Sequence, residues 1–201
     1  MRFLPLFILV TGLTLIIITI FPIGFSQLRY FFSLSPHLID PTAVDFTRAQ
    51  AWFTAPPALA AVSTPVKYFS LSLPRLGLID VPVEVNGTDL KKNAILYSGT
   101  ALPGTFGNSV ILGHSSLPQL YRPGNPLTIF NPLPKAKVGD EVTINFDGTT
   151  YRYVIRQTRE VRPEEVDVLA QRYDKKQLTL ITCVPLGTYW RRFVATAELV
   201  N

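Results

Sequence analysis

Short stretches in which apolar and polar residues alternate fill the chain from Tyr68 to its end. The clearest pair is 141–146 and 150–156, joined through Asp147-Gly148, a dipeptide typical of a tight hairpin turn. An apolar, β-branched run, 178–183, is typical of a buried strand. Further candidate strands cover 69–73, 78–85, 109–114 and 193–200. About eight strands with only short helical turns predict an all-β barrel or sandwich.

The N-terminal stretch has a different pattern. Phe3 to Leu28 contains no charged residue, and almost every residue from Leu4 to Phe25 is apolar. About 20 such residues span a bilayer core as a helix, whereas a cleaved signal peptide has an apolar region of roughly 7–15 residues. We therefore expect one N-terminal transmembrane helix at residues 1–28, held in membrane lipid, although Gly24-Phe25-Ser26 could serve as a cleavage site. A basic tip kept inside predicts that the remainder lies outside the cytoplasm.

The segment between this helix and the strands is rich in alanine and proline. Residues 55–65 in particular have the composition of an extended, semi-rigid spacer. The sequence thus predicts three parts: a membrane anchor at 1–28, a juxtamembrane stalk at 29–66 and a β domain at 67–201.

Composition excludes several functions. The net charge of +5 comes from scattered residues, and there is no basic run with interleaved aromatic residues, so we expect no nucleic-acid partner. The spacing of histidine, cysteine and acidic residues matches no metal site, and a glycine-rich phosphate loop is missing from the sequence. We therefore expect neither a metal ion nor another cofactor.

The candidate chemistry begins with Cys183, the only cysteine, at the end of its apolar strand. A single cysteine cannot form an intramolecular disulfide, so this thiol is either buried and inert or reactive. A reactive thiol needs a base or a cation nearby. His114 ends another apolar strand, and Arg191 and Arg192 follow Cys183 after a short loop. Taken singly, the histidine fits a structural role and the arginines an exposed basic loop.

Together these residues carry a resemblance. Leu178-Thr-Leu-Ile-Thr-Cys183, followed by Arg192-Phe-Val-Ala-Thr-Ala, resembles the TLxTC…R signature of sortases. Gly107-Asn-Ser-Val-Ile-Leu-Gly-His114 is similar to the GNxVIxGH strand of the same family. The resemblance covers about residues 67–201, with the motifs in the family's order. It implies an eight-stranded sortase β-barrel and a membrane-anchored cysteine transpeptidase.

The resemblance also implies roles for individual residues. Cys183 attacks the threonine carbonyl of an LPxTG-like sorting signal, and His114 protonates the leaving amine and later deprotonates the incoming one. Arg192 takes the family's arginine position in preference to Arg191, because Ala197 then aligns with the family's small residue. Three residues are expected to contact the substrate: Thr182, Ile181 and Leu112.

The implied partners are proteins with a C-terminal LPxTG-like signal and an amine acceptor, either a cell-wall peptide or a pilin lysine. The chain resembles class D or E sortases more than pilin-assembling ones, since Thr42 stands where their Asp-Pro-aromatic motif has its aromatic residue. Two alternatives stay open at this stage. One is a thiol hydrolase on the same barrel, and the other is a membrane-tethered barrel that binds peptides or scaffolds proteins without catalysis.

Overall fold

The computed structural model describes residues 11–15, 44–57 and 59–200. Most of the expected anchor at 1–28 and the first part of the expected stalk lie outside these residues. Within the described residues, no helix has both the length and the apolar character needed to cross a membrane. Val44–Asn201 forms one compact unit, and the following description concerns this unit.

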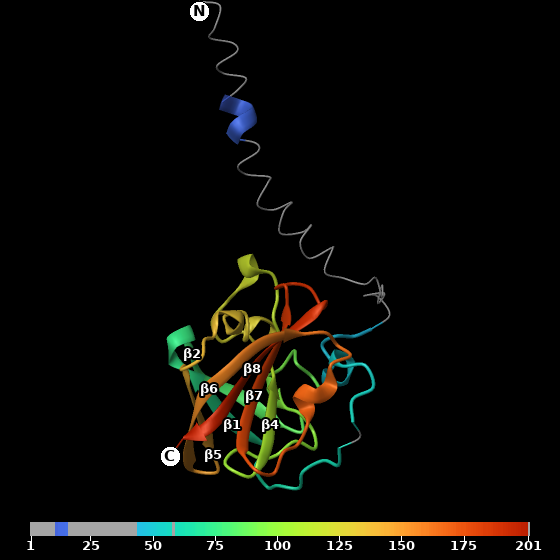
Figure 1. Cartoon of the computed structure of the whole chain (residues 1–201), viewed down its shortest axis with the longest axis vertical. Coiled ribbons are helices and arrows are strands. Elements are labelled where there is room, and N and C mark those ends of the chain that lie inside the picture. The colour runs from blue at the N-terminus through green and yellow to red at the C-terminus, as the bar shows by residue number, and fades with distance from the viewer. Residues whose placement is uncertain (1–10, 16–43, 58, 201) are drawn as a thin grey trace, which may run out of the picture. The chain divides into compact units, whose positions relative to one another are not determined.

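Eight strands close into a barrel, which confirms the predicted all-β fold (Figure 1). Their order around the barrel is β1-β2-β3-β4-β7-β8-β6-β5. The strands are β1 (Tyr68–Leu73), β2 (Leu78–Val85), β3 (Ala94–Leu96), β4 (Gly107–Leu112), β5 (Glu141–Phe146), β6 (Thr149–Val161), β7 (Lys176–Val184) and β8 (Arg191–Val200). The β2–β3 and β4–β7 pairs are parallel, and the other pairs are antiparallel.

Short 3₁₀ turns lie before β1 and in the connections between strands. They are η1 (Ala49–Trp52), η2 (Pro74–Leu76), η3 (Pro118–Leu120), η4 (Pro126–Thr128), η5 (Leu133–Lys135) and η6 (Val166–Leu169). The predicted hairpin joins β5 to β6, with Asp147 at φ 49° and Gly148 at φ 72°. Positive φ at both central residues is the geometry that matches the twist of a two-residue hairpin.

Strand alternation divides the apolar residues of the barrel between two cores. Side chains that point inward, such as Ile111, Leu180 and Ala195, form the interior core. Their neighbours along the same strands point outward and belong to a second core; these are Val110, Leu112, Ile181, Cys183 and Val194. The outer face of β4, β7 and β8 is therefore apolar and needs a cover.

Residues 44–54, which we call the covering segment, supply part of that cover. Trp52 and Phe53 are buried in the second core. The segment is fixed by main-chain hydrogen bonds from Ala49 to Thr88 (3.1 Å), from Leu90 to Thr47 (2.9 Å) and from Thr54 to Pro163 (3.0 Å). In Figure 1 it is drawn in cyan beside the orange loop between β6 and β7. These contacts extend further toward the N-terminus than residue 67, where the barrel was expected to begin.

Candidate active site

The parallel pairing of β4 with β7 brings His114 next to Cys183. The register pairs Leu112 with Ile181, and the Gly113 amide continues it by donating to the Ile181 carbonyl (3.1 Å). Two residues further along each of these two strands, His114 lies alongside Cys183. The side chains of Leu112 and Ile181 point outward. His114 and Cys183 each follow one of them by two residues, so alternation directs both side chains to the same outer face.

Arg192 reaches the same place from β8. The antiparallel β7–β8 ladder pairs Cys183 directly with Arg192 and Ile181 with Val194. Arg191 is paired with Val184, whose side chain belongs to the interior core, and its guanidinium lies 4.0 Å from the Glu160 carboxylate. The strand register therefore places Arg192 beside the thiol and turns Arg191 away from it.

The Arg192 side chain is fully buried, and main-chain carbonyls surround its guanidinium. Nε and Nη2 both donate to the Trp52 carbonyl, at 3.0 and 2.7 Å. Nη1 donates to the carbonyls of Tyr189 (2.8 Å) and Arg191 (3.2 Å). The guanidinium carbon also lies 5.5 Å from the Trp52 ring centroid, within the range of a cation–π contact. Burial of this charge is thus compensated by neutral acceptors.

His114 is held by groups on both sides of its ring. Nδ1 lies 2.8 Å from the Leu127 carbonyl, to which it donates in the neutral ring, and this leaves Nε2 as the unprotonated nitrogen. The His114 carbonyl accepts from the Phe130 amide (3.1 Å), and the Tyr189 ring packs edge-on at 6.5 Å between centroids. Burial lowers the pKa of His114, which favours the neutral imidazole.

Cys183 is 1% exposed. This burial raises the pKa of its thiol to about 11, while the positive charge of Arg192 acts in the opposite direction. In this covered arrangement a neutral thiol therefore faces a neutral imidazole. Conversion to a thiolate, the nucleophilic form, requires water or a substrate dipole to replace the apolar cover.

Two side chains fix the strand ends that carry these groups. The Ser115 hydroxyl donates to the Cys183 carbonyl (2.8 Å), and the Thr182 hydroxyl donates to the Gly113 carbonyl (2.9 Å). A Cβ on Gly113 would lie 2.4 Å from Phe130 ring carbons, so only glycine fits before His114 without displacement of that ring. The histidine and the cysteine are thereby held in register by both strands.

The remaining predicted site residues occupy two faces of the barrel. Leu112 and Ile181 are in the second core, on the same face as the thiol. Thr182 alternates with Cys183, is paired with the interior residue Phe193, and uses its hydroxyl on Gly113. Its expected contact with substrate stays a prediction, and the hydrogen bond gives it a structural role in addition.

Sequence analysis did not single out Trp52 or Tyr189. Tyr189 lies in the β7–β8 loop, stacks on Phe46 (4.3 Å between centroids) and contacts both His114 and Arg192. Phe46, Ala49 and Phe53 form a short amphipathic pattern in the sequence. Nothing in that pattern, however, indicates which part of the barrel the segment covers.

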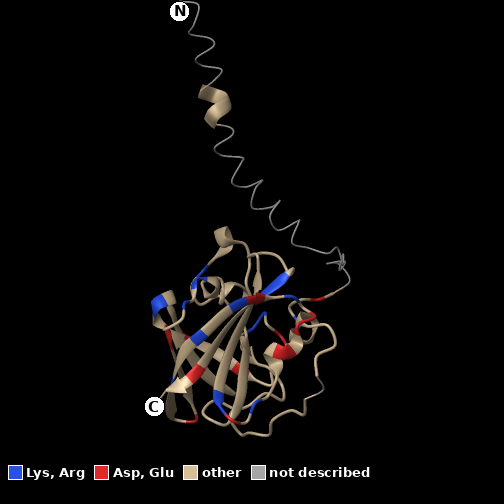
Figure 2. Cartoon of the chain, viewed as in Figure 1, with Lys and Arg blue, Asp and Glu red and all other residues tan. Residues whose placement is uncertain are grey.

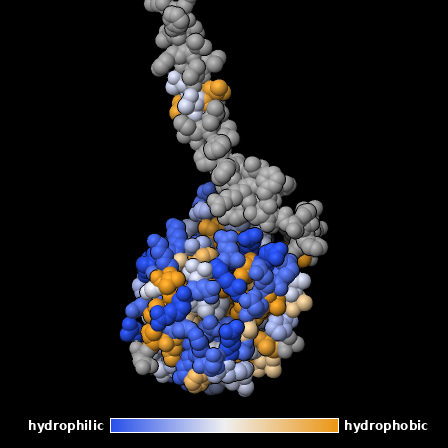
Figure 3. All heavy atoms as spheres, viewed as in Figure 1, coloured by the Kyte–Doolittle hydropathy of each residue, from blue (hydrophilic) through white to orange (hydrophobic). Residues whose placement is uncertain are grey.

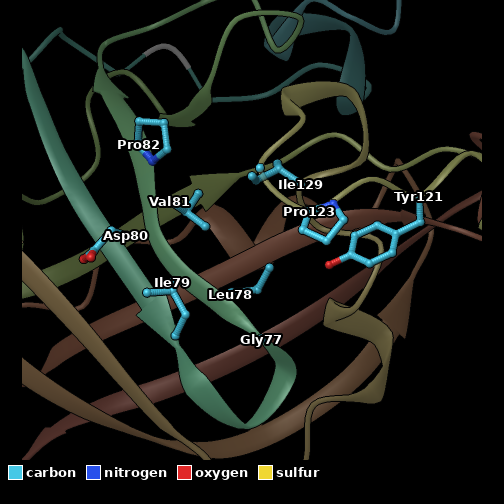
Figure 4. Close-up of a pocket in the computed structure, with 10 residues that line it drawn as sticks. Gly77, Leu78, Ile79, Asp80, Val81, Pro82, Tyr121, Pro123 and Ile129 are labelled. Carbon is cyan, nitrogen blue, oxygen red and sulfur yellow. The ribbon is translucent and has the colours of Figure 1, made fainter.

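A separate surface pocket of about 230 Å³ lies between the start of β2 and the loop that follows η3 (Figure 4). It is lined by Gly77–Pro82, Tyr121, Pro123, Gly124 and Ile129. Its lining shares no residue with the second core, among the parts of the chain that the structure describes. Figure 2 shows basic and acidic residues interspersed over the barrel, and Figure 3 shows a mostly hydrophilic face with small apolar groups. Of the surfaces considered, the outer face of β4, β7 and β8 is the one that gathers reactive groups.

Comparison with known proteins identifies relatives of this arrangement. The Sortase domain family matches residues 71–200. Sortase A of Streptococcus agalactiae is 31% identical over 140 residues, which cover 65% of this chain and 55% of that protein. Sortase A of Listeria monocytogenes is 30% identical over 128 residues, 62% of this chain and 56% of that protein. The chain thus spans a little over half the length of these curated relatives.

Solved structures agree with the sequence matches. A lid mutant of sortase A from Corynebacterium diphtheriae superposes with a TM-score of 0.59 at 31% identity, over 69% of this chain and 73% of that one. The sortase D5 transpeptidase of Clostridium perfringens gives a TM-score of 0.56 at 26% identity, over 70% of this chain and 82% of that one. The matched region includes β4, β7 and β8, which carry the three candidate groups.

Proposed function

Since the chain belongs to the sortase family, we propose that it is a cysteine transpeptidase that cleaves an LPxTG-like sorting signal and transfers the acyl fragment to an amine. The observation that carries this proposal is the convergence of Cys183, His114 and Arg192 on one face of three adjacent strands. A buried thiol, a base and a fixed cation are the groups that acyl transfer through a thioester requires.

In the proposed reaction the Cys183 thiol first gives its proton to His114 Nε2. The resulting thiolate Sγ then attacks the threonine carbonyl carbon of the sorting signal. A C–S bond forms, and the carbonyl π electrons move onto oxygen to give a tetrahedral oxyanion. Collapse of this intermediate breaks the C–N bond, and His114 Nε2–H gives its proton to the departing amine. Nε2 then takes a proton from the incoming amine, whose nitrogen displaces the thiolate from the thioester. Proton transfer by one imidazole in both directions needs a pKa near the working pH.

Arg192 supplies the fixed charge in this scheme. The planar guanidinium already donates two hydrogen bonds to one carbonyl oxygen, that of Trp52. The same geometry suits a carbonyl of the substrate main chain, or the oxyanion that develops on one. A lysine at this position could not offer two donors in a fixed plane.

The proposed partners are proteins with a C-terminal sorting signal and an amine acceptor, a cell-wall peptide or a pilin lysine. We place the barrel outside the cytoplasm, tethered by the apolar stretch at residues 1–28, because the sorting reaction joins proteins to the cell envelope. Leu112 and Ile181 would contact the apolar residues of the signal, since they flank the thiol on the same face.

The test is incubation of the protein with an LPxTG-type peptide, followed by intact-mass measurement. The wild-type protein should carry the acyl fragment on Cys183, and addition of a glycine-rich or lysine-bearing amine should yield ligated peptide. Cys183→Ala should give neither product. Turnover unchanged in that variant contradicts the mechanism, and hydrolysed peptide without ligation at saturating amine identifies a thiol hydrolase instead.

A further inference from the structure

One peptide group in the connection between β4 and β5 decides which ring nitrogen of His114 carries the proton. The Leu127 carbonyl lies 2.8 Å from Nδ1, so in the neutral ring Nδ1 is the donor and the lone pair is on Nε2. Without that acceptor a neutral imidazole can carry its proton on either nitrogen, and with the proton on Nε2 it cannot accept one there. Whatever holds this carbonyl therefore controls the form in which His114 waits.

The same peptide group is held at its nitrogen as well. The amide of Thr128 shares a plane with the Leu127 carbonyl, and it donates to the Asn125 carbonyl (3.0 Å). The Asn125 side chain also accepts from the Leu127 amide (2.9 Å), as the cap of η4. Because the peptide is planar, a fixed N–H also fixes the direction of the C=O toward His114.

The Thr128 side chain closes the segment that ends at this peptide group. Its hydroxyl is buried, donates to the Arg122 carbonyl (3.0 Å) and accepts from the Arg122 amide (3.2 Å). One hydroxyl thus satisfies both main-chain groups of a residue six positions earlier. The turn from 122 to 128 is thereby closed on itself by a single side chain.

A second buried side chain closes the base of the whole connection. Asn131 Oδ1 accepts from the Ser116 amide (2.8 Å), and Asn131 Nδ2 donates to the Ser116 carbonyl (3.1 Å). Beside it, the Phe130 amide donates to the carbonyl of His114 itself (3.1 Å). The chain therefore leaves the His114 strand end and returns to it at a fixed point, with Leu127 inside the closed loop.

We propose that Thr128 and Asn131 are positioning residues for His114, which hold the Leu127 carbonyl against Nδ1 and so keep the lone pair on Nε2. Asn131 sets where the loop returns, and Thr128 sets how the Leu127–Thr128 peptide group is turned. The inference rests on the proposed function for the reaction that His114 serves, but the tautomer itself is a property of this chain alone.

Loss of the Thr128 hydroxyl should therefore alter the ring of His114. Its hydrogen bond to the main-chain carbonyl raises the pKa of the imidazole against the effect of burial, so a released carbonyl should lower that pKa. The other groups that act on the ring are the charge of Lys91, the ring of Tyr189 and the Cys183 thiol on the neighbouring strand. Replacement of the hydroxyl changes none of these three.

The experiment compares variants of the full chain. Thr128→Val removes the hydroxyl at nearly constant shape, and Thr128→Ser keeps it. Thr105→Val is the matched control, because the Thr105 hydroxyl also donates to a main-chain carbonyl, that of Leu102 (2.7 Å), in the loop before β4. Nitrogen-15 NMR of the imidazole rings reports the tautomer and its titration, with His37, the second histidine, as the internal reference. Thermal melting reports whether each variant is folded.

Wild type, Thr128→Ser and Thr105→Val should all show His114 protonated on Nδ1, whereas Thr128→Val should show a mixture with the Nε2–H form and a lower titration midpoint. With an LPxTG-type peptide, kcat of Thr128→Val should fall about tenfold, the factor that corresponds to one hydrogen bond, at an unchanged KM. Asn131→Ala, at the other end of the loop, should change the tautomer in the same direction. It provides an independent variant.

An unchanged tautomer in folded Thr128→Val or folded Asn131→Ala overturns the inference. So does a rise in KM at constant kcat, which would make the loop a substrate contact. These outcomes are separable from the proposed function. A changed tautomer without cleavage of any sorting peptide by the wild type supports the positioning role and contradicts the transpeptidase. Cleavage by the wild type with one tautomer in all variants supports the transpeptidase and contradicts the positioning role.

Discussion

Cys183 and Arg192 are direct partners across the β7–β8 ladder, and each shapes the electrostatic environment of the other. The guanidinium charge opposes the rise that burial causes in the pKa of the thiol. Burial lowers the pKa of Arg192 as well, and the charge of a Cys183 thiolate opposes that effect. The pair is thus arranged so that a thiolate, once formed, has a fixed cation beside it.

The two adjacent arginines should respond differently to mutation. Arg192→Ala removes the charge beside the thiol and the donors proposed to hold a substrate carbonyl, so we expect peptide cleavage to fall by about 10²–10³-fold. Arg191→Ala removes a partly exposed pair with Glu160, so cleavage should change by no more than about twofold. Steady-state kinetics on the sorting peptide provide the measurement. The opposite ranking would mean that the ladder register is displaced by one residue.

The pH dependence of thiol reactivity should reflect the burial of Cys183. With a thiol pKa of about 11 rather than the ordinary 9.0, the logarithm of the wild-type alkylation rate should continue to rise with unit slope past pH 9. Because the pKa is raised in the folded state, the protonated thiol contributes stability that is complete below pH 9 and is lost as pH rises toward 11. A rate plateau near pH 9 in the wild type would contradict a buried thiol.

Gly113→Ala should disturb the strand end that carries His114. The new Cβ would lie 2.4 Å from ring carbons of Phe130, so either the ring or the strand must move. We expect a loss of about 1–3 kcal/mol in the free energy of unfolding, measured by urea denaturation, together with slower cleavage. Phe130→Leu is the control. In the double variant the losses should be less than additive, because the smaller side chain relieves the contact.

Gln171→Ala should alter the β6–β7 loop beside the second core without altering the reactivity of the Cys183 thiol. Its Oε1 accepts from the amides of Ala101 (3.3 Å) and Asn108 (3.0 Å), and its Nε2 donates to the carbonyls of Asn108 (3.0 Å) and Leu169 (3.1 Å). It therefore fixes the end of the β6–β7 loop, which packs η6 against the second core. Gln171→Ala should raise KM for peptide at an unchanged Cys183 alkylation rate.

The control for this loop variant is the exposed neighbour Arg172→Ala, which should leave KM unchanged. We expect Gln171→Ala to cost about 1–2 kcal/mol of stability, from main-chain groups that lose their partners. Faster alkylation in Gln171→Ala would show instead that the loop holds the covering segment in place.

Local sequence patterns were enough to predict a β-barrel and to single out the three candidate groups. Period-two alternation and apolar runs identified most of the strands, and Asp147-Gly148 identified the β5–β6 hairpin, because these signals are local. The three-residue strand β3 was not among the predicted strands. The motifs around His114 and Cys183 each lie within one strand and its end, so they too could be recognised from adjacent residues. Alignment of Ala197 with the family's small residue selected Arg192 over Arg191, which also uses neighbouring residues only.

The segment that covers the outer face of β4, β7 and β8 could not be predicted from the sequence. The contact between Trp52 and Arg192 joins positions 140 residues apart. The acceptor is a main-chain carbonyl, which every residue has, so this hydrogen bond leaves no pattern in the sequence. The orientation of the Thr182 hydroxyl toward Gly113 likewise depends on the packing of β4 against β7. Local periodicity fixes which side chains point outward. It does not fix which distant segment buries them, because the hydrophobic effect is non-directional and many apolar segments could cover the same face. Only shape complementarity and hydrogen bonding select one of them.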